Sequence, residues 1–203
     1  MEEEILTNHR QYLERKALYQ SLGYDVDQER SFILKNSQPI KGRILEAGTG
    51  KGHFTLELAK AGYKLTTFDI SETEQHFARL NLRYLGLESQ VDFRVENGES
   101  LSFADKSFDV ILSVNTLHHL ANPYQVIDEF LRVLAWKGKL VISDFTKTGM
   151  ELMDKVHASE GGKHEVGKTG LSDIERYLQN KGFATKKSAS KYQEVLIASH
   201  QPA

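Results

Sequence analysis

The 203-residue chain has no cysteine, only three prolines and one tryptophan, and no long apolar run. The absence of cysteine excludes disulfide frameworks, thiolate zinc sites and cysteine nucleophiles. No apolar segment approaches the roughly 20 residues that a membrane-spanning helix needs. The acidic N-terminus also differs from the basic start of a signal peptide. We therefore expect a cytoplasmic protein without membrane insertion.

A large excess of one charge is absent as well. The 26 Lys and Arg residues are balanced by 28 Asp and Glu residues, for a formal net charge of −2. This balance creates no strong field toward nucleic acid, so we expect no nucleic-acid partner. The length suits one domain over residues 1–203, because a core of that size needs neither disulfides nor metal.

Apolar runs alternate with helical stretches along most of the chain. After a polar helix over 2–22, strands are expected over 43–47, 64–68, 91–95, 108–114 and 139–143, with helices over 53–61, 71–85 and 122–135. Beyond a less regular stretch from 144 to about 170 we expect a helix near 171–181. Two last strands, 183–188 and 194–199, are expected to pair antiparallel at the sheet edge. The pattern predicts an α/β fold, with a seven-stranded, mostly parallel sheet and helices on both faces.

The strongest local signal is a glycine-rich turn after the first expected strand. Residues 44–52 read Ile-Leu-Glu-Ala-Gly-Thr-Gly-Lys-Gly, and the third glycine of a G-x-G-x-x-G dinucleotide fingerprint is replaced by His53. Glycines allow a tight turn and a close approach of backbone to ligand. The next strand ends in Asp69, whose carboxylate can bind both hydroxyls of a ribose. A nucleoside ligand is predicted, unless the turn only packs a helix and Asp69 only caps the helix near Ser71.

Residues 42–145 resemble the class I S-adenosylmethionine-dependent methyltransferases in the order of four segments. Segment 44–52 is similar to the family's first motif, and Asp69 to its ribose-binding acid. Segment 95–109 is similar to one that usually reads Gly-Asp-Ala-x-x-Leu-Pro-Phe, and 113–120 (Ser-Val-Asn-Thr-Leu-His-His-Leu) to a strand end in small-molecule enzymes related to quinone biosynthesis. Asn97 replaces the usual Asp, but its carbonyl oxygen still accepts a bond from an adenine amino group, while the Gly98 N–H serves a ring nitrogen. Ser102 replaces a Pro, and residues 135–138 (Ala-Trp-Lys-Gly) replace a Lys-Pro-Gly-Gly turn.

This resemblance implies a Rossmann-like enzyme that transfers the methyl group of S-adenosylmethionine to a small-molecule acceptor by in-line displacement. It implies a helical cap over 1–40, a cofactor-binding core over 42–145, an acceptor-side lid over 146–170, and a C-terminal helix with edge strands over 171–203. The chain is expected to act as a monomer or homodimer. The residues implied to bind the cofactor, with Glu46 near the methionyl amino group, are Glu46, Ala47, Gly48, Thr49, Gly50, Gly52, Asp69, Ile70, Asn97, Gly98, Glu99, Ser113, Val114 and Asn115.

Four histidines are candidate catalytic bases. His118 and His119 follow the fourth strand, although one ring of such a doublet can instead bind backbone carbonyls while the other faces solvent. His157 and His164 lie in the expected lid. If 150–160 is helical, Asp154, His157 and Glu160 share a face that contacts the acceptor or binds a metal with His164. The alternative that we favour is an amphipathic lid without metal, with Leu152, Met153 and Val156 packed inward.

Two other functions compete with methyl transfer. One is a sensor that binds the cofactor or its demethylated product, which a lid plugging the crevice above Gly48 and Asn115 would favour. The other is a nicotinamide-dependent dehydrogenase, against which His53 and the Asn97-Gly98 pair argue. Tyr12 and Tyr19 of the first helix are expected either to form a pocket wall or to serve ordinary packing.

Overall fold

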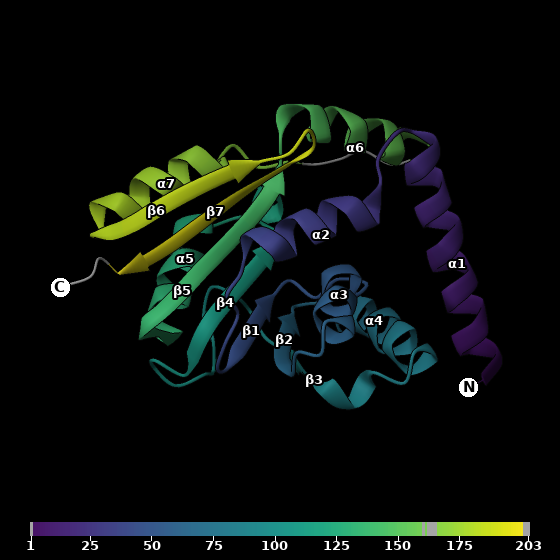
Figure 1. Ribbon diagram of the computed structural model, residues 1–203, viewed down its shortest axis with the longest axis horizontal. Helices are drawn as coiled ribbons and strands as arrows, with labels where there is room; N and C mark the ends of the chain where they lie inside the picture. The colour runs from purple at the N-terminus through teal and green to yellow at the C-terminus, as the bar shows by residue number, and fades with distance from the viewer. Residues whose placement is uncertain (1, 160, 162–165, 201–203) are drawn as a thin grey trace.

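The computed structural model describes residues 2–159, 161 and 166–200, and its centre is a seven-stranded sheet (Figure 1). The strand order is β3-β2-β1-β4-β5-β7-β6. Strands β1 to β5 run parallel, whereas β7 pairs antiparallel with β5 and with the edge strand β6. The predicted antiparallel pair at the sheet edge is thus confirmed. The strands are β1 (Ile44–Ala47), β2 (Leu65–Asp69), β3 (Val91–Val95), β4 (Phe108–Val114), β5 (Leu134–Phe145), β6 (Phe183–Ala189) and β7 (Gln193–His200).

Helices cover both faces of the sheet, as predicted. In Figure 1, α2 crosses one face together with α3, while α5 and α7 lie on the other, and α1 and α6 lie beyond the strand ends. The helices are α1 (Glu2–Ser21), α2 (Val26–Asn36), α3 (His53–Lys60), α4 (Glu72–Tyr84), α5 (Pro123–Val133), α6 (Lys147–Ser159) and α7 (Leu171–Asn180). Single 3-10 turns are η1 (Glu88–Gln90) and η2 (Leu117–His119). No described helix is both long and apolar enough to cross a bilayer.

The two hydrophobic layers follow from the alternation of side chains along each strand. Ile111 packs toward α5 and α7, whereas its neighbours Val110 and Leu112 pack toward α2 and α3. All three are at most 3% exposed. Such continuous burial is expected of strands covered on both faces.

Helix α2 lies within the helical cap expected over 1–40, although no separate helix was expected at these residues. Its N-terminus is capped by Asp25, whose Oδ1 accepts a bond of 3.0 Å from the Gln28 N–H. Glu29 and Arg30 are buried together with Val26 and Ile33. These buried charged residues interrupt the apolar periodicity by which a helix is recognised, although Asp25 is itself a helix-start signal.

Two local expectations differ from the structure. The strand expected over 139–143 is longer, because β5 begins at Leu134 and includes residues 135–138, and the β4–β5 register shifts between Phe108 and Val110. The stretch after residue 144, expected to be less regular, contains the 13-residue helix α6, in agreement with the alternative in which 150–160 is helical. Leu152, Met153 and Val156 of α6 are buried against Tyr24 and other residues, while Asp154 is exposed, as the amphipathic interpretation predicted.

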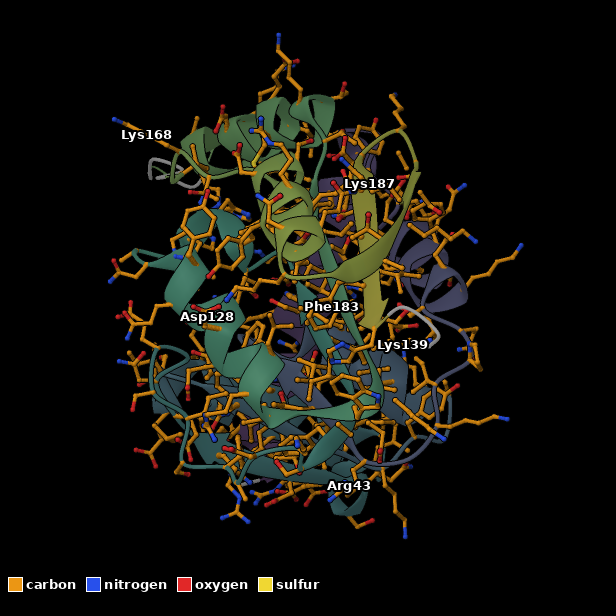
Figure 2. The ribbon with its side chains drawn as sticks, turned by 90° about the vertical axis from the view of Figure 1, so that its left-hand side faces the viewer. Arg43, Asp128, Lys139, Lys168, Phe183 and Lys187 are labelled. Atoms are coloured by element: carbon orange, nitrogen blue, oxygen red, sulfur yellow. The ribbon has the colours of Figure 1, made fainter. Side chains whose placement is uncertain are left out.

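Charged side chains protect the edge of the sheet. Figure 2 looks onto this side, with Asp128 labelled on α5 and Phe183 and Lys187 on β6. The Lys187 ammonium pairs with Glu175 at 3.5 Å, and Asp128 binds both Tyr177 of α7 and Lys181, the residue after this helix. Lysines on an edge strand oppose pairing with another sheet, so this arrangement disfavours aggregation through β6.

The turn before α3 generates a stability prediction. Gly52 has φ +78°, and a Cβ there would come within 2.6 Å of the Ala78 Cβ on α4. We expect Gly52→Ala to lower the free energy of unfolding by about 2–5 kcal/mol, combining left-handed strain with overpacking. Gly62 has φ +86°, but a Cβ there would meet no described atom within 4 Å, so Gly62→Ala is expected to cost only about 1–2 kcal/mol. Urea unfolding measures both, and equal losses would contradict the packing role of Gly52.

Candidate functional site

A cavity of about 590 Å³ lies at the carboxyl ends of the central strands. Ligands of open α/β sheets bind at this edge, where successive strands lead into loops. Its walls come from the ends of β1, β2, β4 and β5, and from α1, α2 and α6. The residues that line the cavity include Arg15, Tyr19, Tyr24, Arg30, Glu46, Gly48, Thr49, Gly50, Lys51, His53, Asp69, Ile70, Val114, Asn115, Thr116, His118, His119, Phe145, Met153 and His157.

The glycine turn forms the floor of this cavity. Gly48 has φ +84°, and a Cβ there would lie 2.3 Å from the Thr116 Oγ1, so only glycine fits. The N–H groups of Gly48 and Thr49 both donate to the Phe68 carbonyl of β2, at 2.9 and 3.0 Å. The turn is therefore held by backbone hydrogen bonds to β2 and packs closely against the loop after β4.

Asp69 connects the glycine turn to the end of β2. Its Oδ2 accepts a 2.7 Å bond from the Gly50 N–H, and its Oδ1 accepts one of 2.9 Å from the Ser71 N–H. The cap of α4 is Ser71, whose hydroxyl accepts from the Glu74 N–H. A carboxylate can accept about four bonds, so Asp69 has further capacity for ligand hydroxyls in the cavity.

Glu46 is a buried acid at the centre of the site. Only 2% of it is exposed, and its Oε2 accepts bonds from the hydroxyls of Thr55 at 2.6 Å and Thr67 at 2.8 Å. Burial raises the pKa of Glu46 to about 7, partly offset by these two bonds. Near neutral pH this group therefore responds strongly to a positive charge in the cavity.

Asn115 has a conformation that non-glycine residues rarely adopt. It follows β4 with φ +54°, and its N–H donates to the Ser143 carbonyl at 2.8 Å. Its Oδ1 is buried and accepts no bond from the described residues. Strained backbone and an unsatisfied buried acceptor are features of ligand sites, and this oxygen suits a ligand N–H or O–H.

His118 and Asp144 form a buried pair at the cavity wall. The Nδ1 of His118 lies 2.6 Å from the Asp144 Oδ1, and both side chains are at most 6% exposed. The backbone N–H groups of His118 and Phe145 also donate to this carboxylate, at 3.0 and 2.8 Å. Because an ionised carboxylate only accepts, Nδ1 carries the proton and Nε2 is the basic nitrogen. The pair can therefore take a proton from a bound molecule.

Sequence reasoning identified His118 but missed Asp144. The aspartate directly follows the strand that was predicted to end at residue 143, so the strand-end rule applied to Asp69 would have indicated it as well. His119 also lines the cavity but is exposed, which separates the two members of the doublet.

Three basic residues of the other wall surround His53. Burial, and then the nearby charges of Arg30, Arg15 and Lys51, hold the pKa of His53 well below its usual range. Arg30 is 8% exposed, and among the described residues its Nη1 donates only to the Tyr12 hydroxyl, at 3.4 Å. A buried guanidinium normally has an anionic partner, so this wall suits a negatively charged ligand group.

Some predicted site residues lie at the same edge without lining the cavity. These are Ala47, Gly52, Asn97, Gly98, Glu99 and Ser113. The Asn97 Oδ1 accepts from the Glu99 N–H at 2.9 Å, and the Glu99 carboxylate accepts from the Asn122 amide. The Glu96 N–H bond of 3.1 Å to the Asp69 carbonyl keeps this loop beside the end of β2.

Of the histidines predicted in the lid, one lines the cavity and the other lies outside the described residues. His157 of α6 lines the cavity beside Met153. His164 and Glu160 lie outside the residues that the structure describes. Within the described ranges, no cluster of three or more histidine and acidic side chains could hold a metal ion.

Comparisons with known proteins give a consistent result. Residues 45–142 match a protein family described as "Methyltransferase domain". The chain is 30% identical over 147 residues to 27-O-demethylrifamycin SV methyltransferase of Amycolatopsis mediterranei (strain S699), covering 70% of this chain and 53% of that protein. It is 29% identical over 158 residues to a ubiquinone biosynthesis O-methyltransferase of Nitrosococcus oceani, covering 77% and 66%. A SAM-dependent methyltransferase structure from Methanosarcina mazei has a TM-score of 0.63 at 25% identity, covering 83% of this chain and 96% of that one. The chain spans about half to two thirds of the length of these curated relatives.

The raised pKa of Glu46 predicts a pH-dependent stability. The folded chain retains this proton up to pH 7, whereas the unfolded chain releases it near the ordinary value of 4.5. The free energy of unfolding should therefore fall by about 3 kcal/mol, from this group alone, as pH rises from 4.5 to above 7. Glu46→Gln retains an oxygen for Thr55 and Thr67 but cannot ionise. Urea unfolding at pH 5 and pH 8 should show a fall about 3 kcal/mol smaller in the variant, and identical falls would contradict the raised pKa.

Proposed function

The chain belongs to the S-adenosylmethionine-dependent methyltransferase family, and on this premise we propose that it transfers the methyl group of S-adenosylmethionine to a small-molecule acceptor. The observation that carries the proposal is the strand-end cavity, where Asp69, Asn115 and the His118–Asp144 pair meet around the glycine turn. A nucleoside site and a proton acceptor thus border one space.

The polar groups of the cavity fit the polar groups of the methyl donor. Asp69 suits the ribose hydroxyls, while Glu46 and the unsatisfied Asn115 Oδ1 suit the methionyl ammonium. Arg30 suits the methionyl carboxylate, because its guanidinium is buried and a hydroxyl is its only hydrogen-bond partner among the described residues. The side chain of Ile70, 72% exposed, offers an apolar surface for adenine beside the Asn97-Gly98-Glu99 loop.

The methyl donor supplies a sulfonium methyl group that is already activated for in-line displacement. The chain's own contribution is to place the acceptor on that line in a site shielded from water, an effect of about 7–11 kcal/mol in well-oriented systems. Nε2 of His118 receives the proton of an acceptor hydroxyl. Asp144 fixes the tautomer and orientation of His118 and stabilises the resulting imidazolium.

Aromatic and apolar side chains line the acceptor end of the cavity. Tyr24 and Phe145 have ring centroids 6.3 Å apart, and the Phe145 ring lies 5.7 Å from that of His118. Tyr19 and Met153 complete this wall. An acceptor with an apolar body and one ionisable hydroxyl fits these surroundings.

The competing functions are not favoured. A sensor would be expected to have its crevice plugged by the lid, whereas the cavity extends over both Asn115 and His118. A nicotinamide-dependent dehydrogenase does not agree with the family to which residues 45–142 belong.

Calorimetric titration tests the cofactor assignment. S-adenosylmethionine and its demethylated product should bind the wild-type chain, and NAD should not. Asp69→Ala should weaken both interactions about ten- to a hundredfold, because it removes charge-assisted hydrogen bonds. Asp92→Ala, at an exposed residue of β3, is the matched control and should bind like the wild type. Selective binding of NAD, or no nucleoside binding at all, would overturn the proposal.

Turnover of an acceptor tests the His118–Asp144 pair. An acceptor is first identified by transfer of a radiolabelled methyl group from S-adenosylmethionine to a panel of phenols, catechols and hydroxy acids. His118→Ala should then lower kcat about 10²- to 10⁴-fold without changing the affinity for the demethylated product. His119→Ala is the control for the doublet, and a loss as large as that of His118→Ala would contradict the assignment. Asp144→Asn should also lower kcat, because an amide no longer fixes the proton of His118 on Nδ1.

A further inference from the structure

The turn between β6 and β7 lies behind the acceptor end of the cavity. Residues 190–192 connect the two strands, and the Ser190 N–H donates to the Gln193 carbonyl at 2.8 Å, which closes the turn. Figure 1 shows this turn next to the start of α6. None of residues 190–193 lines the cavity. Any effect of the turn on a bound acceptor therefore acts through the residues that the turn contacts.

Tyr192 connects the turn to both segments that flank the acceptor wall, which consists of Tyr19, Tyr24, Phe145 and Met153. Its hydroxyl donates to the Gly23 carbonyl at 3.0 Å, directly before Tyr24 in the α1–α2 connection. Its own carbonyl accepts a bond of 2.9 Å from the Thr146 N–H, directly before α6. A Cβ at Gly149 of α6 would lie 2.3 Å from the same carbonyl, so this helix packs against the turn without space for a side chain. The turn thus holds the backbone on either side of the wall.

Gln193 holds the side chain of Tyr24 itself. Its amide is fully buried, and the Nε2 donates to the Tyr24 hydroxyl at 3.2 Å. The Tyr24 ring also packs against that of Tyr192, with the centroids 5.3 Å apart. Burial raises the pKa of Tyr24 to about 12, so its hydroxyl stays neutral near physiological pH. This hydroxyl is therefore a tether for the ring and not a proton acceptor like His118.

The same amide is connected to the opposite side of the cavity, where the methyl donor is proposed to bind. Its Oε1 accepts from the Ser143 hydroxyl at 3.0 Å, and Ser143 shares this proton with the Glu194 carbonyl at 2.8 Å. The Ser143 carbonyl accepts from the Asn115 N–H at 2.8 Å. A chain of hydrogen bonds therefore links Tyr24 of the acceptor wall to Asn115. Such a buried polar chain holds its members in one arrangement, because each loses a partner if it moves.

Methyl transfer is sensitive to such positioning. In-line displacement requires the acceptor to be aligned with the methyl group, and a misplacement of about 1 Å caused far from the chemistry can cost about 10²-fold in rate. From the bonds above we propose, resting on the proposed function, that Gln193 is a positioning residue for methyl transfer, which sets the acceptor wall relative to the methyl donor through Tyr24. It acts from outside the cavity, so its contribution belongs to kcat and not to cofactor affinity.

Kinetics with the acceptor identified in the panel above tests this role. Gln193→Met retains the length and packing of the side chain but removes both hydrogen bonds of the amide. The rate is expressed per chain that binds the demethylated product in calorimetry, so that loss of folded protein does not count. We expect kcat to fall about 10- to 100-fold, while KM for the acceptor and the affinity for the demethylated product stay within about threefold of wild type.

Tyr24→Phe removes the other end of the same hydrogen bond and retains the ring. It should lower kcat about as much as Gln193→Met, and the double variant should be no slower than the slower single variant, because the bond is lost only once. In NMR spectra, Tyr24→Phe should also shift the side-chain amide signals of Gln193. Gln28→Met and Tyr124→Phe, at exposed residues of α2 and α5, are the matched controls and should change none of these quantities.

Three outcomes would overturn the inference: a wild-type kcat in both single variants, additive losses in the double variant, or a loss in KM or cofactor affinity instead of kcat. The wild-type chain separates this inference from the proposed function. If it binds no demethylated product or methylates no member of the panel, the proposed function fails and the positioning role with it. If it transfers methyl groups and tolerates both substitutions, only the positioning role of Gln193 is wrong.

Discussion

The site depends on the parallel pairing of β1 with strands on both sides. All four residues of β1 are buried, and their register with β2 and β4 fixes where the chain leaves the sheet. Gly48 therefore emerges between the end of β2 and the Thr116 loop after β4, where no side chain larger than hydrogen fits. The Gly50 bond to Asp69 and the positive φ of Asn115 occur at the ends of the same neighbouring strands. A change in strand register would separate these groups, because each owes its position to the strand before it.

Charge is divided across the cavity. The acids Glu46 and Asp69 belong to the sheet side, where hydroxyls and backbone N–H groups stabilise them. The cations Arg15 and Arg30 belong to the two N-terminal helices, and Lys51 of the glycine turn lines the same cavity. A molecule with a positive centre and a negative end is consequently oriented before any bond to it changes. Such preorganised polarity is effective in a site with little water, since the fixed groups need not rearrange during the reaction.

Much of the fold and of the strand-end cavity could be predicted from sequence, because local patterns specify them. Short apolar runs predicted the strands, and the rule that ligands bind at strand ends brought Gly48, Asp69 and His118 together. Features that depend on contacts distant in sequence were missed. Asp144 gains its role from His118, 26 residues away, and Arg30 from the cavity above it. Helix α2 was missed because its buried charges mask its periodicity. The cytoplasmic location and the monomeric or homodimeric state stay predictions.

The walls of the proposed acceptor space are formed by other segments of the chain than its floor. The family match covers residues 45–142, whereas Arg15, Tyr24 and Met153 come from α1, the α1–α2 connection and α6, which lie outside it. Under the proposed function, selection can therefore alter the acceptor without disturbing the segments proposed to bind the methyl donor. For protein engineering, exchange of residues 1–40 and 146–159 between homologues is a more economical route to a new acceptor than substitution within the sheet. The same division allows related chains to diverge in chemistry while their central fold changes little.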